Sequence, residues 1–375
     1  MKVGVLREQA QGERRVALIP SALAPLLKAK LEVLVEAGAG LEAGFGDQAY
    51  KDAGANVVAR SELIASADLL VSIRPPNAEL NPKQAAIALF DALWAPDDVP
   101  VKTGATLFSL DLVPRTTRAQ AMDVLSSQAN LGGYLGVIIG AAELPKVLPM
   151  MTTAAGTLAP AKVLILGAGV AGLQAIATAR RLGAVVSAYD VRSAVKEQIE
   201  SLGARFVELP IEAEAQDAGG YAKALGEEFY AKQRQLLGDV LAEMDMVVTT
   251  AAVPGMKSPI LVTQPMVERM AAGSVIVDLA AERGGNCEVT KAGETVIHHG
   301  VRILGPLNLP SRLATHASQL FSKNIQSFLL NMIKDGELNL NMEDPIVAGS
   351  LLAKGGEFVN KQVRERLGLD KGGAQ

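Results

Sequence analysis

The feature that most constrains the fold is the run KVLILGAGVAGLQAIATARRLGAVVSAYD, residues 162–190. Its first apolar segment is uninterrupted, which is typical of a strand buried on both faces. A glycine-rich turn, a helical stretch and a second apolar segment follow. Strands that alternate with helices in this way form parallel βαβ units. The sequence therefore predicts an α/β domain built on a parallel sheet.

Three glycines of this run, Gly167, Gly169 and Gly172, have the spacing G-x-G-x-x-G between the strand and the helix. The first permits a tight turn, the second lets the backbone approach a pyrophosphate, and the third lets helix and strand pack closely. The helix that opens at Val170 would offer free N–H groups and the positive end of its dipole to phosphate oxygens. This context predicts a dinucleotide site, and a nucleotide-free α/β domain is the alternative.

Asp190 ends the second strand, roughly twenty residues after the glycines, where a carboxylate bonds the ribose hydroxyls of a dinucleotide. A carboxylate there repels a 2′-phosphate, so the site should prefer NAD(H) over NADP(H). Arg192 lies two residues later and could soften that preference. We assign Val191, between them, to the same cofactor site.

Strand and helix patterns alternate through the rest of the chain as well, for example in KVGVL, PSALAPLLKA and LEVLVEAGA near the start and in DMVVTTA, GSVIVDLA and VRILG later. A chain of 375 residues is long enough for two domains. We expect two Rossmann-like, doubly wound parallel-sheet domains with a cleft between them. The predicted bounds are 1–135 with returning helices in 312–375, and 136–311 for the NAD(H)-binding domain.

The segment 212–234, EAEAQDAGGYAKALGEEFYAKQR, interrupts the strand series and is highly charged. A loop of this length in a compact α/β domain is often a lid, while its composition also fits a solvated surface helix. Both interpretations stay open from composition alone, and we expect a mobile loop here.

Composition excludes several classes of function. A net charge of −4 gives no reason to expect nucleic-acid binding, which usually requires a basic surface. The single cysteine, Cys287, excludes an internal disulfide framework and suits a reducing compartment. The longest uncharged run, residues 163–179, is marginal in length for a membrane helix and is broken by glycines. We expect a cytoplasmic protein that does not itself insert into a membrane.

Residues for proton chemistry are scarce. The three histidines are His298, His299 and His316, and the first two are adjacent on an apparent strand, which would point them to opposite faces. Neither has metal-ligand spacing with a carboxylate, so we expect no metal site. Arg74, in SIRPP, stands where a lysine that polarises a carbonyl could have been expected. The sequence thus strongly predicts a site for a hydride-carrying cofactor, but offers few residues that could donate a proton to a substrate.

Residues 115–134, RTTRAQAMDVLSSQANLGGY, place polar groups in an apolar neighbourhood. Gln120, Asp123 and Ser126 are three apart, which would align them along one stripe of a helix, and Arg115 precedes them. The stripe either binds a polar ligand or merely faces solvent.

Together, blocks such as ERRVALIP, SIRPP, RTTRAQAMDVLSSQAN, GAGVAGLQAIATARRLGA, GGYAKALGEEF, VIVDLAAERGGNCEVT and LNLPSR resemble domain I of proton-translocating nicotinamide nucleotide transhydrogenase. This is the NAD(H)-binding domain, which some bacteria make as a separate soluble subunit, the first portion of a divided alpha subunit. The resemblance runs over essentially the whole chain in the same order.

That family is related to alanine dehydrogenase, which is the main rival interpretation. Alanine dehydrogenases carry a lysine and a histidine where this sequence has Arg74 and Asp111, and an aspartate in the segment where Glu282 lies. The departures favour transhydrogenase. Hydride then passes from one nicotinamide ring to another, and catalysis needs orientation and exclusion of water with no proton donor.

The resemblance also implies roles for individual residues. Asp123, Ser126 and Arg115 would hold the carboxamide of NAD(H), and Gln120 would reach toward NADP(H) on a partner. Further cofactor contacts implied in the same way are Gly220 and Tyr221 in the mobile loop and Gln233 and Ala252 on the adenosine side.

The family implies assembly as well. We expect a homodimer that docks on a separate NADP(H)-binding domain, carried by a beta subunit, and on the membrane-spanning second portion of the alpha subunit. These partners would hold the chain at the inner face of the plasma membrane.

Overall fold

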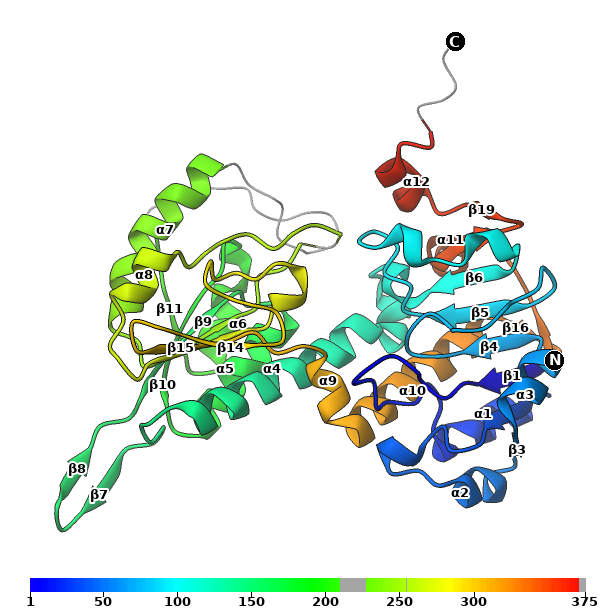
Figure 1. The fold of residues 1–375 in the computed structure, drawn as a ribbon, viewed down its shortest axis with the longest axis horizontal. Coiled ribbons are helices and arrows are strands. Elements are labelled where there is room, and N and C mark those ends of the chain that lie inside the picture. Colours follow the sequence, from blue (N-terminus) through cyan, green and yellow to red (C-terminus); the bar gives the residue numbers. More distant parts are fainter. Residues whose placement is uncertain (210–226, 254, 371–375) are drawn as a thin grey trace. The chain divides into compact units, whose positions relative to one another are not determined.

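The computed structural model describes residues 1–209, 227–253 and 255–370 (Figure 1). The chain divides into two compact units, unit 1 from Met1–Gln128 with Pro310–Gln375 and unit 2 from Ala129–Leu309. The first boundary lies at Gln128, inside the unbroken helix α4 (Val124–Glu143), and not at the predicted residue 135. No glycine or proline breaks the chain at that point, so the sequence offers no mark of the boundary.

Unit 1 is built on an eight-stranded sheet in the order β19-β18-β6-β5-β4-β1-β2-β3. Neighbours from β6 to β3 pair in parallel, and β18 pairs antiparallel with both β6 and β19. The strands are β1 (Lys2–Val5), β2 (Glu32–Glu36), β3 (Asn56–Val58), β4 (Leu69–Val71), β5 (Ala85–Ala88), β6 (Thr106–Ser109), β18 (Leu351–Lys354) and β19 (Glu357–Phe358).

Helices cover both faces of this sheet, because alternate residues of each strand point to opposite sides. In β1 and β4, Val3 and Leu69 join one apolar cluster, while Leu70 joins the other. The first cluster includes residues of α1 (Leu23–Lys28), α2 (Asp47–Asp52), α10 (Ala314–Met332) and α11 (Pro345–Ser350), and the second includes residues of α3 (Arg60–Ser66) and α12 (Lys361–Leu367).

Helix α10 is central to unit 1 although it lies more than two hundred residues after the first strands. Its side chains Phe321 and Phe328 are fully buried in the first cluster. The ring of Phe328 meets the ring of Phe108 in β6 edge to face, with centroids 6.2 Å apart. The core of unit 1 is therefore shared between the two chain segments.

Unit 2 has a seven-stranded sheet in the order β11-β10-β9-β12-β13-β15-β14, parallel except for the β14–β15 hairpin. The strands are β9 (Lys162–Leu166), β10 (Val185–Tyr189), β11 (Arg205–Phe206), β12 (Met246–Thr249), β13 (Val275–Asp278), β14 (Thr295–His298) and β15 (Val301–Leu304).

This sheet is also covered on both faces. Val163 and Ile165 of β9 pack in one cluster with α4, α5 (Val170–Arg181) and α6 (Lys196–Ser201). Leu164 and Leu166 pack in the other with α7 (Glu227–Ala242) and α8 (Gln264–Glu268). The predicted α/β class with two Rossmann-like, doubly wound sheets is confirmed.

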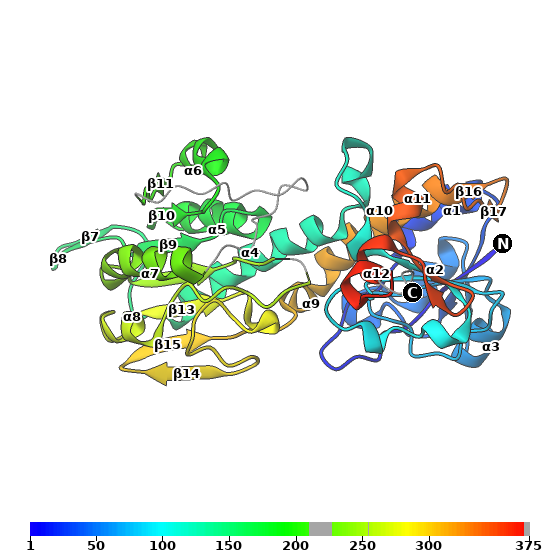
Figure 2. The ribbon, with the colours of Figure 1, turned by 90° about the horizontal axis from the view of Figure 1, so that it is seen from above.

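A small hairpin, β7 (Met151–Thr153) and β8 (Gly156–Leu158), projects from unit 2 away from its sheet in both views (Figures 1 and 2). All six strand residues are exposed, Met151 and Leu158 among them. A two-stranded hairpin with no covered face is only marginally stable in water. Among the described residues, none of the helices is long and apolar enough to span a bilayer.

Candidate functional site

The glycine turn lies at the carboxyl end of β9, where α5 begins. Gly167 has φ of +95°, a left-handed conformation that favours glycine. A Cβ on Gly172 would lie 1.8 Å from the carbonyl oxygen of Gly167, so the third glycine is required by packing. A Cβ on Gly169 would meet nothing within 4 Å, so this glycine borders open space. The turn thus has the cradle geometry that the spacing predicts.

The turn also occupies the switch point of the sheet. β9 is flanked by β10 on one side and β12 on the other, so successive crossovers leave it in opposite directions. Ligands of doubly wound proteins bind in the crevice that this reversal opens at the carboxyl ends of the strands. Thr250, just after β12, donates from its hydroxyl to the carbonyl oxygen of Gly167 at 3.0 Å and fixes the turn from that side.

Asp190 follows β10 and is held tightly. Its Oδ2 accepts the N–H of Ala168 in the glycine turn at 2.7 Å, which ties the end of β10 to the turn. Arg192 folds back on the same carboxylate, with Nε 2.9 Å from Oδ1 and Nη2 2.8 Å from Oδ2. The pair is nearly buried. Arg192 therefore neutralises part of the charge by which Asp190 would reject a 2′-phosphate.

Gln233 of α7 contacts Tyr189, the last residue of β10. The amide Nε2 of Gln233 donates to the hydroxyl of Tyr189 at 2.9 Å, and the Gln233 side chain is fully buried. Its Oε1 has no hydrogen-bond partner among the described residues. A buried acceptor left unpaired is costly, so this oxygen is suited to a donor from a bound ligand.

The predicted loop 212–234 is wrong over its last eight residues, because 227–234 forms the first half of α7. Leu237 and Leu241 of that helix are fully buried, and this apolar spacing extends the helix back through Gln233. Gly220 and Tyr221 lie outside the described residues.

Two residues that sequence reasoning did not single out organise the loop after β12. Asn286 accepts the N–H of Ala251 and donates to its carbonyl oxygen, which shapes the backbone beside the exposed Ala252. Asp278, at the end of β13, accepts the backbone N–H of Asn286 and the hydroxyl of Thr249. The block GGNC, which contains Asn286, is the sequence feature that could have indicated this structural role.

In unit 1, Arg115, Asp123 and Ser126 form one cluster at the start of α4. Asp123 Oδ1 accepts the N–H of Ser126 at 2.9 Å, and Oδ2 accepts its hydroxyl at 2.6 Å. Arg115 donates to the Ser126 hydroxyl at 3.4 Å and lies 3.8 Å from Asp123 Oδ2. Asp123 thereby caps the first turn of the helix.

The predicted single helical stripe is wrong at its start. Residues Thr117–Met122 form a separate 3₁₀ helix, and α4 begins only at Val124 because the Asp123 cap starts a new helix there. Gln120 lies exposed on the 3₁₀ helix, outside the cluster. Ser127 faces away and bonds Asn324 of α10 at 2.7 Å.

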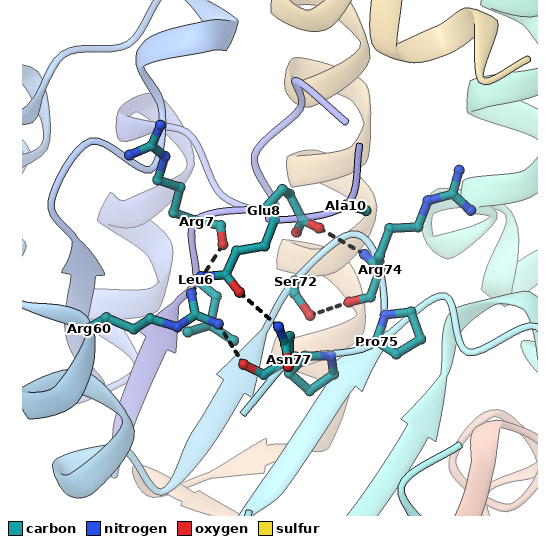
Figure 3. A pocket seen from close by; sticks show the side chains of 11 residues that line it. Leu6, Arg7, Glu8, Ala10, Arg60, Ser72, Arg74, Pro75 and Asn77 are labelled. Atoms are coloured by element: carbon teal, nitrogen blue, oxygen red, sulfur yellow. Dashed lines mark hydrogen bonds between the residues drawn. The ribbon is translucent and has the colours of Figure 1, made fainter. Parts of the chain in front are cut away.

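Unit 1 has a pocket of its own, of about 190 Å³, at the carboxyl ends of β1 and β4 (Figure 3). These strands are neighbours at the switch point of that sheet. Its lining is Leu6, Arg7, Glu8, Gln9, Ala10, Arg60, Ser72, Arg74, Pro75, Pro76 and Asn77. The lining contains arginine and glutamate but neither lysine nor histidine.

Glu8 is the acidic group of this pocket, and sequence reasoning missed it. Its carboxylate accepts the backbone N–H groups of Ile73 at 2.6 Å and Arg74 at 3.2 Å. Burial, with a smaller contribution from the nearby charge of Glu13, raises the pKa of Glu8 to about 7. Glu8 therefore changes its charge near neutral pH.

The block ERRVALIP encloses a buried ion pair. Arg15 makes two bonds to Glu13, from Nε at 2.7 Å and from Nη2 at 2.6 Å, and a third to Gln128 at 2.9 Å. Arg74 bonds the same Glu13 at 3.3 Å. The guanidinium of Arg74, which is partly exposed, is thus held by Glu13.

Asp111 is partly buried, and burial raises the pKa of its carboxyl.

The fold and the two sites define a class of protein. Residues 4–132 match the N-terminal domain model, and residues 136–361 the C-terminal domain model, of the alanine dehydrogenase/PNT family. The chain belongs to that family.

Within it, the chain is 45% identical to the first portion of NAD(P) transhydrogenase subunit alpha of Rhodospirillum rubrum, over 96% of this chain and 98% of that protein. The solved structure of a transhydrogenase from Sinorhizobium meliloti superposes with a TM-score of 0.87 at 44% identity, covering 96% of this chain and all of that one. An L-alanine dehydrogenase structure superposes with a TM-score of 0.81 at 27% identity, covering 98% and 99%.

Proposed function

We propose that this chain is the NAD(H)-binding subunit of a proton-translocating transhydrogenase, an oxidoreductase that exchanges hydride directly between NAD(H) here and NADP(H) on a partner domain. The glycine turn at the switch point of unit 2, with Asp190 bonded to it, carries the proposal. The similarity to the transhydrogenases of R. rubrum and S. meliloti supports the same function.

The residues of unit 2 fit the dinucleotide. The free N–H groups that open α5 at Val170 would bind its pyrophosphate, for which Gly169 leaves room. Asp190 would accept hydrogen bonds from the ribose hydroxyls. The unpaired Oε1 of Gln233 would accept a hydrogen bond from the adenine amino group, beside the loop of Ala252.

In unit 1, the Arg115–Asp123–Ser126 cluster would orient the carboxamide of NAD(H), because its hydroxyl, guanidinium and carboxylate offer both donors and acceptors. The cluster contains neither histidine nor lysine, which suits a hydride transfer that moves no proton. Gln120, exposed beside it, would face NADP(H) on the partner. The cleft that the sequence predicts stays a prediction.

We also propose the assembly that the sequence implies. A second copy of the chain would cover the exposed β7–β8 hairpin, whose Met151 and Leu158 are 45% and 52% exposed, and so form a homodimer. The NADP(H)-binding beta subunit and the membrane-spanning second portion of the alpha subunit would then hold it at the inner face of the membrane. Sedimentation of the parent and of Leu158→Asp tests the homodimer, since the variant should sediment as a monomer.

The test of function mixes the purified chain with a purified NADP(H)-binding domain and follows reduction of an NAD analogue by NADPH. We expect turnover only in the mixture. Asp123→Asn should lower kcat about tenfold or more, since it removes charge-assisted hydrogen bonds worth about 1.5–3 kcal/mol. Arg118→Ala is the matched control, because Arg118 is exposed and pairs with Asp344 away from the cluster. An inactive mixture would contradict the proposal.

One observation favours a second candidate, an amino-acid dehydrogenase resembling alanine dehydrogenase. The pocket of unit 1 contains Glu8, a carboxyl with a pKa of about 7, which is able to protonate a small substrate near neutral pH. That function requires the chain alone to make alanine from pyruvate, ammonia and NADH. Such turnover without a partner would favour it over the transhydrogenase.

A further inference from the structure

The tip of the β14–β15 hairpin brings two histidines together. Two residues, His299 and Gly300, join the strands, and both have positive φ, +48° and +77°. This is the pattern of a type I′ turn. Because His299 belongs to the turn and not to the strand, its side chain does not alternate with that of His298. The rings lie 4.9 Å apart, so the expectation that they point to opposite faces is wrong.

A carboxylate from a different element meets both rings. Glu268 ends helix α8, and its Oε1 lies 2.9 Å from Nε2 of His298 and 3.8 Å from Nε2 of His299. One ligand atom from each of the three residues lies within 4.8 Å of the other two, a grouping found among the residues that the structure describes. The expectation that no carboxylate accompanies these histidines is therefore also wrong.

The spacing suits a late first-row metal ion. Zinc lies about 2.0–2.2 Å from nitrogen and oxygen ligands, so the ligand atoms of a tetrahedral site are about 3.3–3.5 Å apart. The observed 2.9 and 3.8 Å bracket that separation, and small rotations of side chains would equalise them. Two imidazoles with one carboxylate favour zinc, cobalt, nickel or copper over magnesium and calcium, which prefer oxygen ligands.

The surroundings support ligation. The side chains of His298, His299 and Glu268 are 25%, 59% and 33% exposed, so an ion can enter and water can complete its coordination. Glu268 offers carboxylate oxygens and the two histidines offer imidazole nitrogens, which are ligand types that a zinc-class ion binds.

We propose that Glu268, His298 and His299 bind one divalent ion of the zinc class and thereby tie the edge hairpin of unit 2 to helix α8. β15 runs parallel to β13, so its first residue, Val301, lies at the amino edge of the sheet. The glycine turn lies at the carboxyl ends of the strands. Metal binding should thus stabilise unit 2 and leave dinucleotide binding unchanged.

The experiment titrates cobalt(II) into the full-length, tag-free chain after chelator treatment and records the visible d–d absorption, with zinc then added as competitor. We expect one ion per chain. His299→Asn should weaken binding at least about tenfold, and asparagine tolerates the positive φ of this turn, so the fold is retained. Glu268→Gln should weaken binding likewise. A circular dichroism spectrum of each variant checks its fold.

His316→Asn is the matched control, because His316 is the third histidine of the chain and lies exposed on α10 in unit 1. It should bind cobalt as the parent does. Parental affinity in His299→Asn, equal loss in His316→Asn, or no binding at millimolar cobalt would each overturn the proposal. A thiolate charge-transfer band would also overturn it, since it would place the ion on Cys287, which is buried and has a pKa raised to about 11 by burial.

Discussion

Replacing Glu8 by glutamine should change how the stability of unit 1 depends on pH. In the folded chain the pKa of Glu8 is raised to about 7, chiefly by burial, from an ordinary value of 4.5. The folded state therefore binds a proton that the unfolded state has released over this interval. The resulting stabilisation is complete below about pH 4.5 and is lost as the pH rises through about 7.

The size of this effect follows from the shift. At about 1.4 kcal/mol for each factor of ten, a rise from 4.5 to about 7 corresponds to up to about 3 kcal/mol. Glutamine has no such titration, so the variant avoids the cost of a buried charge above pH 7. At acid pH the protonated carboxyl of Glu8 offers one full acceptor oxygen to the N–H groups of Ile73 and Arg74, and the glutamine amide offers the same. Glu8→Gln should therefore match the parent in stability at about pH 4 and be more stable than it, by up to about 3 kcal/mol, at about pH 8.

The assay is denaturant unfolding followed by tryptophan fluorescence across this pH range. The chain has a single tryptophan, Trp94, and it lies in unit 1, so the signal reports the unit that contains Glu8. Glu79→Gln is the matched control, because Glu79 is a solvent-accessible carboxylate in the same unit. Its profile should run parallel to that of the parent. Parallel profiles for Glu8→Gln and the parent would refute the reasoning.

Three further outcomes are expected. Asp190→Ala should narrow the preference for NADH over NADPH by only about 1 kcal/mol, because Arg192 already offsets part of the carboxylate charge. Fluorescence titration with both nucleotides measures this preference. An unchanged ratio of the two dissociation constants would count against the role of Asp190. Gly172→Ala should lower the stability of unit 2 by about 3 kcal/mol or more, because the new Cβ would lie 1.8 Å from the carbonyl oxygen of Gly167. Gly169→Ala should keep the fold and bind the nucleotide more weakly, since its Cβ would enter open space. Calorimetry of unfolding and of nucleotide binding distinguishes the two effects. Cys287 should resist disulfide reagents at about pH 8 until denaturant is added, since its pKa is about 11; rapid labelling of the native chain would contradict its burial.

The dinucleotide turn was predictable from sequence because each of its glycines answers a local requirement. Gly167 needs positive φ and Gly172 needs close packing, and both requirements depend on neighbours within the same βαβ unit. The alternation of apolar runs likewise indicated both sheets, because the central strands β4, β5, β12 and β13 are buried on both faces.

What sequence reasoning missed depends on contacts between distant segments. Glu8 acquires its pKa from its burial beside the backbone of Ile73 and Arg74. Asp278 meets Thr249 only when β12 and β13 pair in the sheet. The prediction for His299 was wrong for a local reason, since one residue separates a strand from a turn and decides which way the ring points. The alternation of side chains along a strand cannot show that the strand ends at His298, because the next residue is also a histidine.

The path of the chain through unit 1 has a consequence for protein synthesis. The sheet built from the first 128 residues lacks some of its apolar cover until α10, which ends at Met332, has left the ribosome. All of unit 2, Ala129–Leu309, emerges before that point and can complete its own core. We therefore expect unit 2 to fold first during synthesis, although it is encoded after the first strands of unit 1. Until α10 is synthesised, those strands keep an uncovered apolar face that chaperones can recognise.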